Sequence, residues 1–135
     1  MAGIVKPRPR RTVRRRAVDK RALEAAIECA RIADARRAEE IVVLSIADKI
    51  LVTDYFVIAS ASNKRQIQTI AFEVAKYLRD AGYTHARTEG YEEASWVLVD
   101  GGPVVVHVFR EDLRAYYDLE MLWGDAPKVA WRKRK

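Results

Sequence analysis

Two neighbouring apolar segments, separated by a pair of glycines, leave this chain few possible folds. Residues 95–100 and 104–109 are both rich in valine, and Gly101 and Gly102 stand between them. Short β-branched runs joined by a glycine turn are typical of a β-hairpin. Because an isolated hairpin is at best marginally stable in water, other segments of the chain must extend and cover it.

Three more segments favour strands. Residues 41–46 and 53–60 are β-branched runs, and the short connection between them predicts antiparallel pairing. Residues 84–88 predict a short strand that ends at the turn-like pair Glu89 and Gly90. Together with the hairpin, these segments predict a sheet of about five strands.

Three further segments carry the spacing of amphipathic helices. The first runs from about residue 20 to 37. The second begins after Asn63, a good N-cap with Gln66 three residues further on, and ends at Gly82. The third covers about residues 111–123. The order α-β-β-α-β-β-β-α predicts an α/β (α+β) domain in which helices flank one mixed sheet.

The chain has 135 residues and a net charge of +6, which is unevenly distributed. Residues 1–21 hold nine Lys and Arg against one Asp, a net charge of +8, and residues 132–135 add +4. Residues 22–131 hold twelve basic and eighteen acidic residues, a net charge of −6. We therefore expect one domain at residues 22–127, between a basic, disordered tail at 1–21 and a second basic tail at 128–135.

The basic tails suit a phosphate backbone, whereas the acidic body suits a basic protein surface. The candidate residues for RNA contact are Arg14, Arg15, Arg16, Arg132 and Lys133. Two alternatives for the first tail stay open: a solvated arm without a specific partner, and an organelle transit peptide. The transit peptide is disfavoured because residues 1–21 contain no serine and because Pro7 and Pro9 oppose an amphipathic helix.

The sequence offers little for catalysis or metal binding. Cys29 is the only cysteine, and His85 and His107 are the only histidines, so neither an internal disulfide nor a structural metal is expected. Phosphate-binding glycine loops and the nucleophile-elbow motif are absent. Asp48 and Asp54 make a poor two-metal site, and we expect a turn or cap role for Asp54 and a hydrogen-bonded core position for His107. No enzyme activity and no cofactor are expected, and no apolar run approaches the roughly 20 residues of a membrane-spanning helix.

Large aromatic residues gather in two places. In the first hairpin strand, Trp96 and Asp100 share one face while valines occupy the other, so Trp96 should lie nearer the surface. The last helix cannot easily bury all of its aromatic residues, so at least one of Tyr116, Tyr117 and Trp123 should point outward. Negative charge in the same segments comes from Asp100, Asp118 and Glu120. Exposed Trp and Tyr dominate many protein interfaces, and carboxylates beside them favour a basic partner, so these residues indicate a binding module.

Five short motifs follow one another along the chain. They are TDYFVI at 53–58, SNKRQ at 62–66, Glu89-Gly90 with Trp96, VVVHVF at 104–109 and RAYYDLEMLW at 114–123. In this order they resemble the ribosomal silencing factor family, also called the Iojap-like family, over about residues 23–127. The chain departs from the family pattern at Ala61, where glycine is usual, and at Pro103, where an acidic residue is usual.

The resemblance implies a mixed sheet flanked by helices, related to nucleotidyltransferase folds but without their catalytic carboxylates. It implies binding to the large ribosomal subunit through its fourteenth large-subunit protein, a steric block of subunit association, and lower translation when nutrients are scarce. By the same resemblance, Trp96, Asp100, Tyr117 and Glu120 are the partner-binding residues. Family members tend to self-associate, so a homodimer is an alternative state of the chain.

Two other functions stay open on the sequence alone. A nucleotidyltransferase-type enzyme would need metal-binding acids that the motifs lack. A simple RNA-binding protein would act through its basic tails, and its body at residues 22–131 would have no affinity for ribosomes. We expect a bacterial, cytoplasmic protein, with the mitochondrion or the chloroplast as the alternative location.

Overall fold

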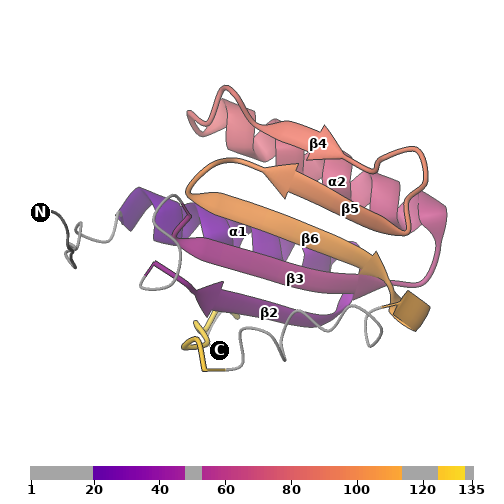
Figure 1. Cartoon of the computed structure of the whole chain (residues 1–135), viewed down its shortest axis with the longest axis horizontal. Coiled ribbons are helices and arrows are strands. Elements are labelled where there is room, and N and C mark those ends of the chain that lie inside the picture. The colour runs from indigo at the N-terminus through magenta and orange to yellow at the C-terminus, as the bar shows by residue number, and fades with distance from the viewer. Residues whose placement is uncertain (1–19, 48–52, 114–124, 133–135) are drawn as a thin grey trace, which may run out of the picture.

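The computed structural model describes residues 20–47, 53–113 and 125–132. Its elements are α1 (Lys20–Ala35), β2 (Glu39–Ser45), β3 (Tyr55–Ala61), α2 (Lys64–Asp80), β4 (Arg87–Glu89), β5 (Trp96–Asp100) and β6 (Val104–Arg110). Figure 1 shows one sheet with α1 and α2 lying together behind it. The predicted α/β (α+β) class, with a mixed five-stranded sheet and flanking helices, is confirmed.

The centre of the sheet is a parallel pair of strands. The strand order is β2-β3-β6-β5-β4, and β3 pairs with β6 from Tyr55 opposite Val104 to Ala61 opposite Arg110. The other pairs, β2 with β3, β5 with β6 and β4 with β5, are antiparallel, which confirms the predicted hairpin and the predicted pairing of the first two strands. Parallel strands need a long crossover, and the segment containing α2, β4 and β5 provides it.

The two central strands are buried on both faces. All seven residues of β3 and six of the seven in β6 are buried, which explains their continuous apolar runs. On the helix side they join the buried faces of α1 and α2 in the larger core. On the opposite face a second cluster is formed by Leu44, Ile46, Phe56, Ile58, Val105, Phe109 and Ala126. Each fully buried aliphatic or Phe side chain contributes about 1.5–3 kcal/mol relative to exposure.

Helix α2 begins at the predicted cap. Asn63 Oδ1 accepts a hydrogen bond from the backbone N–H of Gln66 over 2.8 Å, which confirms Asn63 as N-cap. The Gln66 side chain does not return to Asn63, however: its Oε1 accepts from the backbone N–H of Ser62 over 2.9 Å. Its Nε2 donates to the carbonyl oxygen of Arg36 over 2.8 Å. One glutamine therefore caps α2 and joins it to the end of α1.

Residues 125–132 lie along the outer edge of β2. The backbone N–H of Val129 donates to Val43 O over 2.8 Å. Trp131 packs into the helix-side core, and its indole N–H donates to a β2 carbonyl oxygen over 3.3 Å. The domain boundary at residue 127 stays a prediction, but part of the segment assigned to the second basic tail contacts the domain. Pairing with a strand more than eighty residues away leaves no local sequence signal.

The predicted last helix is described only at its start. Glu111, Asp112 and Leu113 are helical, and the rest of that prediction lies outside the described residues. The first basic tail up to residue 19 and Asp48 also lie outside the described residues. None of the helices in the described ranges combines the length and apolar character needed to cross a bilayer.

Gly90 and Gly102 provide a matched pair of substitutions. Both have left-handed backbone conformations, with φ of +82° and +86°. A Cβ at Gly90 would lie 2.5 Å from the carbonyl oxygen of Trp96, whereas a Cβ at Gly102 would meet nothing within 4 Å. We expect Gly102→Ala to lower the free energy of unfolding by about 1 kcal/mol and Gly90→Ala by about 2 kcal/mol or more. Urea unfolding measures both, and equal losses would contradict the close approach at Gly90.

Candidate functional site

Trp96 lies on the sheet face opposite the two helices. It is the first residue of β5, and it packs half-buried against the second cluster, whereas Val97 and Val99 are fully buried on the helix side. Its indole stacks on the ring of its β6 neighbour Phe109, with ring centroids 5.1 Å apart. The predicted alternation of this strand is therefore confirmed, and Trp96 lies at the border between core and solvent.

A hydrogen bond to His107 orients the indole. Nε1 of Trp96 donates to Nδ1 of His107 over 3.2 Å, so a neutral imidazole carries its proton on Nε2. His107 is only 5% exposed, with the edge-on ring of Phe56 at 4.8 Å and the stacked ring of Phe109 at 6.4 Å between centroids. The prediction of a buried, hydrogen-bonded histidine is confirmed at Nδ1, whereas the buried Nε2 has no hydrogen-bond partner among the described residues.

Burial keeps this histidine neutral. Desolvation lowers the pKa of His107 to about 4, although the negative charge of Asp100 acts in the opposite direction. A general acid or base at neutral pH needs a pKa near 7, so His107 is unsuited to that role. The neutral form is also the one that can accept the indole proton through Nδ1. His107 therefore supports Trp96 and carries no acid–base chemistry.

Asp100 lies at the other end of β5, on the same strand face as Trp96. Four residues of strand place the two Cα atoms about 13 Å apart. One carboxylate oxygen of Asp100 accepts a hydrogen bond from the backbone N–H of Gly102 over 2.9 Å. This bond closes the hairpin turn, so Asp100 has a structural role besides the binding role predicted from the sequence. Its side chain is half-buried, which leaves part of the carboxylate accessible.

Of the remaining predicted contact residues, the structure describes only Arg132. Tyr117, Glu120, Arg14, Arg15, Arg16 and Lys133 lie outside the described residues. Arg132 is described: its guanidinium lies 4.5 Å from the ring centre of Trp131, at the β2 edge of the sheet. Two strands, β3 and β6, separate that edge from β5. The Arg132 side chain is exposed there, and its Nη1 lies 4.0 Å from Oδ1 of Asp34. A surface ion pair of this kind is weak, so the predicted RNA contact stays a prediction.

The described residues hold no group of three or more His, Cys, Asp or Glu side chains that could bind a metal ion. Asp54 is 4% exposed, and its backbone accepts from Ile46 N–H and donates to Pro103 O as the chain enters β3. Cys29 is fully buried in α1, where desolvation raises the pKa of its thiol and favours the protonated form. This confirms Cys29 as a packing residue.

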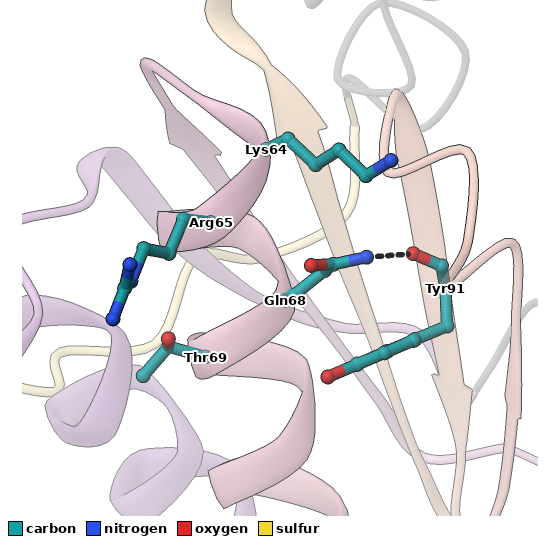
Figure 2. Close-up of a pocket in the computed structure, with 5 residues that line it drawn as sticks. All are labelled: Lys64, Arg65, Gln68, Thr69 and Tyr91. Carbon is teal, nitrogen blue, oxygen red and sulfur yellow. Dashed lines mark hydrogen bonds between the residues drawn. The ribbon is translucent and has the colours of Figure 1, made fainter.

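Sequence reasoning missed a groove at the start of α2. It is lined by Lys64, Arg65, Gln68, Thr69 and Tyr91 and has a volume of about 570 Å³. Figure 2 shows Lys64 extending toward the loop that carries Tyr91, while Arg65 leaves the helix on its other flank. The Gln68 side chain donates to the carbonyl oxygen of Tyr91 over 2.8 Å. The adjacent basic residues and the loop tyrosine were visible in the sequence, but nothing local indicated that they meet.

Comparisons with known proteins establish the family. The profile of the family described as "Ribosomal silencing factor during starvation" matches residues 19–135. The chain belongs to the ribosomal silencing factor family. This confirms the resemblance and identifies the chain with ribosome silencing and the regulation of translation, with the ribosome as partner. Ribosomal silencing factors are regulatory proteins and not enzymes, in agreement with the sequence-based prediction.

Individual relatives support this membership. The ribosomal silencing factor of Halalkalibacterium halodurans is 49% identical to the chain, over 71% of this chain and 82% of its own length. That of Bacillus subtilis is also 49% identical, over 70% of this chain and 80% of its own length. The chloroplastic Iojap protein of Arabidopsis thaliana is 32% identical over 82% of this silencing factor and 46% of its own length. A crystal structure from Chromobacterium violaceum superimposes with a TM-score of 0.70 at 30% identity, over 87% of this chain and 95% of the other.

The lowered pKa of His107 gives this silencing factor a defined pH dependence. The unfolded chain, with an ordinary pKa near 6.5, binds the proton at higher pH than the folded protein, so protonation favours unfolding as pH falls from about 6.5 to about 4. Between pH 7 and pH 5 we expect a loss of about 2 kcal/mol of unfolding free energy from this residue.

His107→Phe keeps a packed ring but removes the titration, so this part of the loss should disappear. Urea unfolding at both pH values measures it, and His85→Ala is the control because His85 is exposed. An unchanged pH dependence in His107→Phe would contradict the assignment.

Proposed function

We propose that this silencing factor binds the large ribosomal subunit through its fourteenth large-subunit protein and blocks subunit joining sterically. The result would be lower translation when nutrients are scarce. Family membership supports the ribosome as partner. The observation that carries the proposal is the position of Trp96, whose indole is held half-buried beside solvent.

The chemistry of this face fits a basic protein partner. Trp and Tyr anchors in partly desolvated positions supply most of the affinity in many interfaces. Asp100 adds negative charge on the same strand face, and the body of the domain has a net charge of −6 at residues 22–131. Such charge steers a cationic partner and fixes its orientation. Tyr117 and Glu120, from the motif at 114–123, complete the proposed contact set.

The location and the assembly state follow from the same proposal. The bacterial relatives support a site of action on cytoplasmic ribosomes. Relatives named as chloroplastic and mitochondrial proteins make an organelle the alternative. A homodimer formed through the Trp96 face would exclude the ribosomal partner, so dimerisation and ribosome binding would compete.

Sedimentation with purified ribosomal subunits tests the proposal. The wild-type protein should comigrate with large subunits and reduce their joining to small subunits. Trp96→Ala and Tyr117→Ala should each weaken large-subunit binding by about 2 kcal/mol or more, roughly thirtyfold. Asp100→Asn should weaken it while keeping an oxygen for the Gly102 N–H, which separates charge from turn structure. Urea unfolding controls for folding; full binding by the folded Trp96→Ala and Tyr117→Ala variants would refute the assigned surface.

The first basic tail is expected to add salt-dependent affinity for ribosomal RNA. The slope of log affinity against log salt concentration falls in magnitude by about 0.7–0.9 for each phosphate that the protein no longer neutralises. Deleting residues 1–21 should therefore flatten the salt dependence of large-subunit binding and leave the Trp96-dependent part intact. An unchanged slope would remove this role, whereas complete loss of binding would favour a protein that acts through its tails alone.

A further inference from the structure

Two large hydrophobic side chains of the described residues are exposed: Phe72 belongs to α2, and Tyr91 lies in the loop beside it. Phe72 is 61% exposed and Tyr91 is 36% exposed. Tyr91 is fixed next to the helix by the hydrogen bond from Gln68 to its carbonyl oxygen (Figure 2). Phe72 follows Gln68 by four residues, so it lies one turn further along the same face of α2. Solvent-facing aromatic residues gathered in this way indicate a binding surface.

Basic side chains frame the same surface. Lys64 and Arg65 line the groove with Tyr91 and diverge to either side of the first turn of α2 (Figure 2). The bond from Gln66 to the carbonyl oxygen of residue 36 brings the end of α1, with the exposed Arg37, to that turn. Lys64, Arg65 and Arg37 form no ion pair with a carboxylate of the described residues. Three cations around one turn of a helix favour an anionic ligand, on a domain that is acidic as a whole.

Cations beside an exposed aromatic ring match the chemistry of an unpaired nucleotide. Single-stranded nucleic acids bind where basic side chains follow the phosphates and aromatic rings stack on the bases. Bases in a duplex are already stacked and paired, so they cannot use such a ring. We propose that the groove at the start of α2 binds single-stranded RNA, with a base stacked on Tyr91 and phosphates held by Lys64 and Arg65. Of the proposed function, this proposal requires only that the ribosome is the partner. It does not depend on the Trp96 face.

The acidic residues that follow Tyr91 distinguish RNA from a basic peptide as the ligand of this groove. Glu92 and Glu93 are both exposed. They repel phosphates, so the RNA chain should run over α2 and not over the loop. A basic peptide in the same groove would instead be attracted by these carboxylates. Neutralising them therefore has opposite effects on the two classes of partner.

The experiment measures binding of the full-length protein to a short fluorescein-labelled oligouridylate by anisotropy across a salt series. Lys64→Ala combined with Arg65→Ala should lower the slope of log affinity against log salt by about 1.4, with about 0.7 from each cation. Tyr91→Ala should weaken binding by about fivefold or more with an unchanged slope, because one base no longer stacks. Its backbone carbonyl still accepts from Gln68, so the loop keeps its anchor.

Matched variants separate this surface from the basic tails. Tyr91→Phe keeps the ring and should bind as the wild type. Lys76→Ala removes one charge from the same helix, about three turns away and beside Asp80, and should leave the salt slope unchanged. Glu92→Gln combined with Glu93→Gln should tighten RNA binding.

The proposal is overturned if the Lys64 and Arg65 double variant keeps the wild-type slope, or if Tyr91→Ala binds RNA as tightly as Tyr91→Phe. Loss of large-subunit binding by Tyr91→Ala without loss of RNA binding would identify a protein partner and also overturn it. Because the assay contains no ribosomal protein, Trp96→Ala should bind the oligouridylate normally. The RNA assay can therefore fail while the proposed subunit block holds, and the subunit block can fail while RNA binding holds.

Discussion

The parallel pairing of β3 with β6 at the centre of the sheet sets the position of the surrounding strands and side chains. Its register sends Val104, Val106 and Val108 toward the helices, and Val105, His107 and Phe109 toward the opposite face. A slip of one residue would exchange these two sets and place the imidazole inside the helix-side core. The turn at Gly101 and Gly102 sets a second register, in which β5 pairs with β6 and Trp96 lies opposite Phe109.

The face opposite the helices combines core and surface in a few side chains. The indole of Trp96 stacks on one buried ring and donates to another, so its orientation is set by the core beneath it. His107 can accept that proton because burial keeps it neutral. A ring fixed in this way loses little conformational entropy on binding, which is the physical advantage of a preorganised anchor. Under the proposed function, this one hydrogen bond links folding to partner recognition.

Much of the fold was predictable because its signals are local. Strand alternation in β5, the glycine hairpin and the Asn63 cap each depend on residues within a few positions of one another. The missing parts depend on distant partners: the Gln66 side chain reaches the carbonyl oxygen of Arg36 at the end of α1, and residues 125–132 pair with β2. The groove beside Tyr91 belongs to this second class, since a loop after β4 and the first turns of α2 form it together.

Patterns along the chain were enough to establish most of the helices and strands, the family, and the face of β5 that carries its tryptophan, because periodicity and motif order are local properties. The folded arrangement was needed to show that His107 orients the indole and that Lys64 and Tyr91 line one groove. These interactions join residues whose separation in sequence carries no periodic signal. They exist because the pairing of strands and the docking of helices bring those side chains within reach of one another.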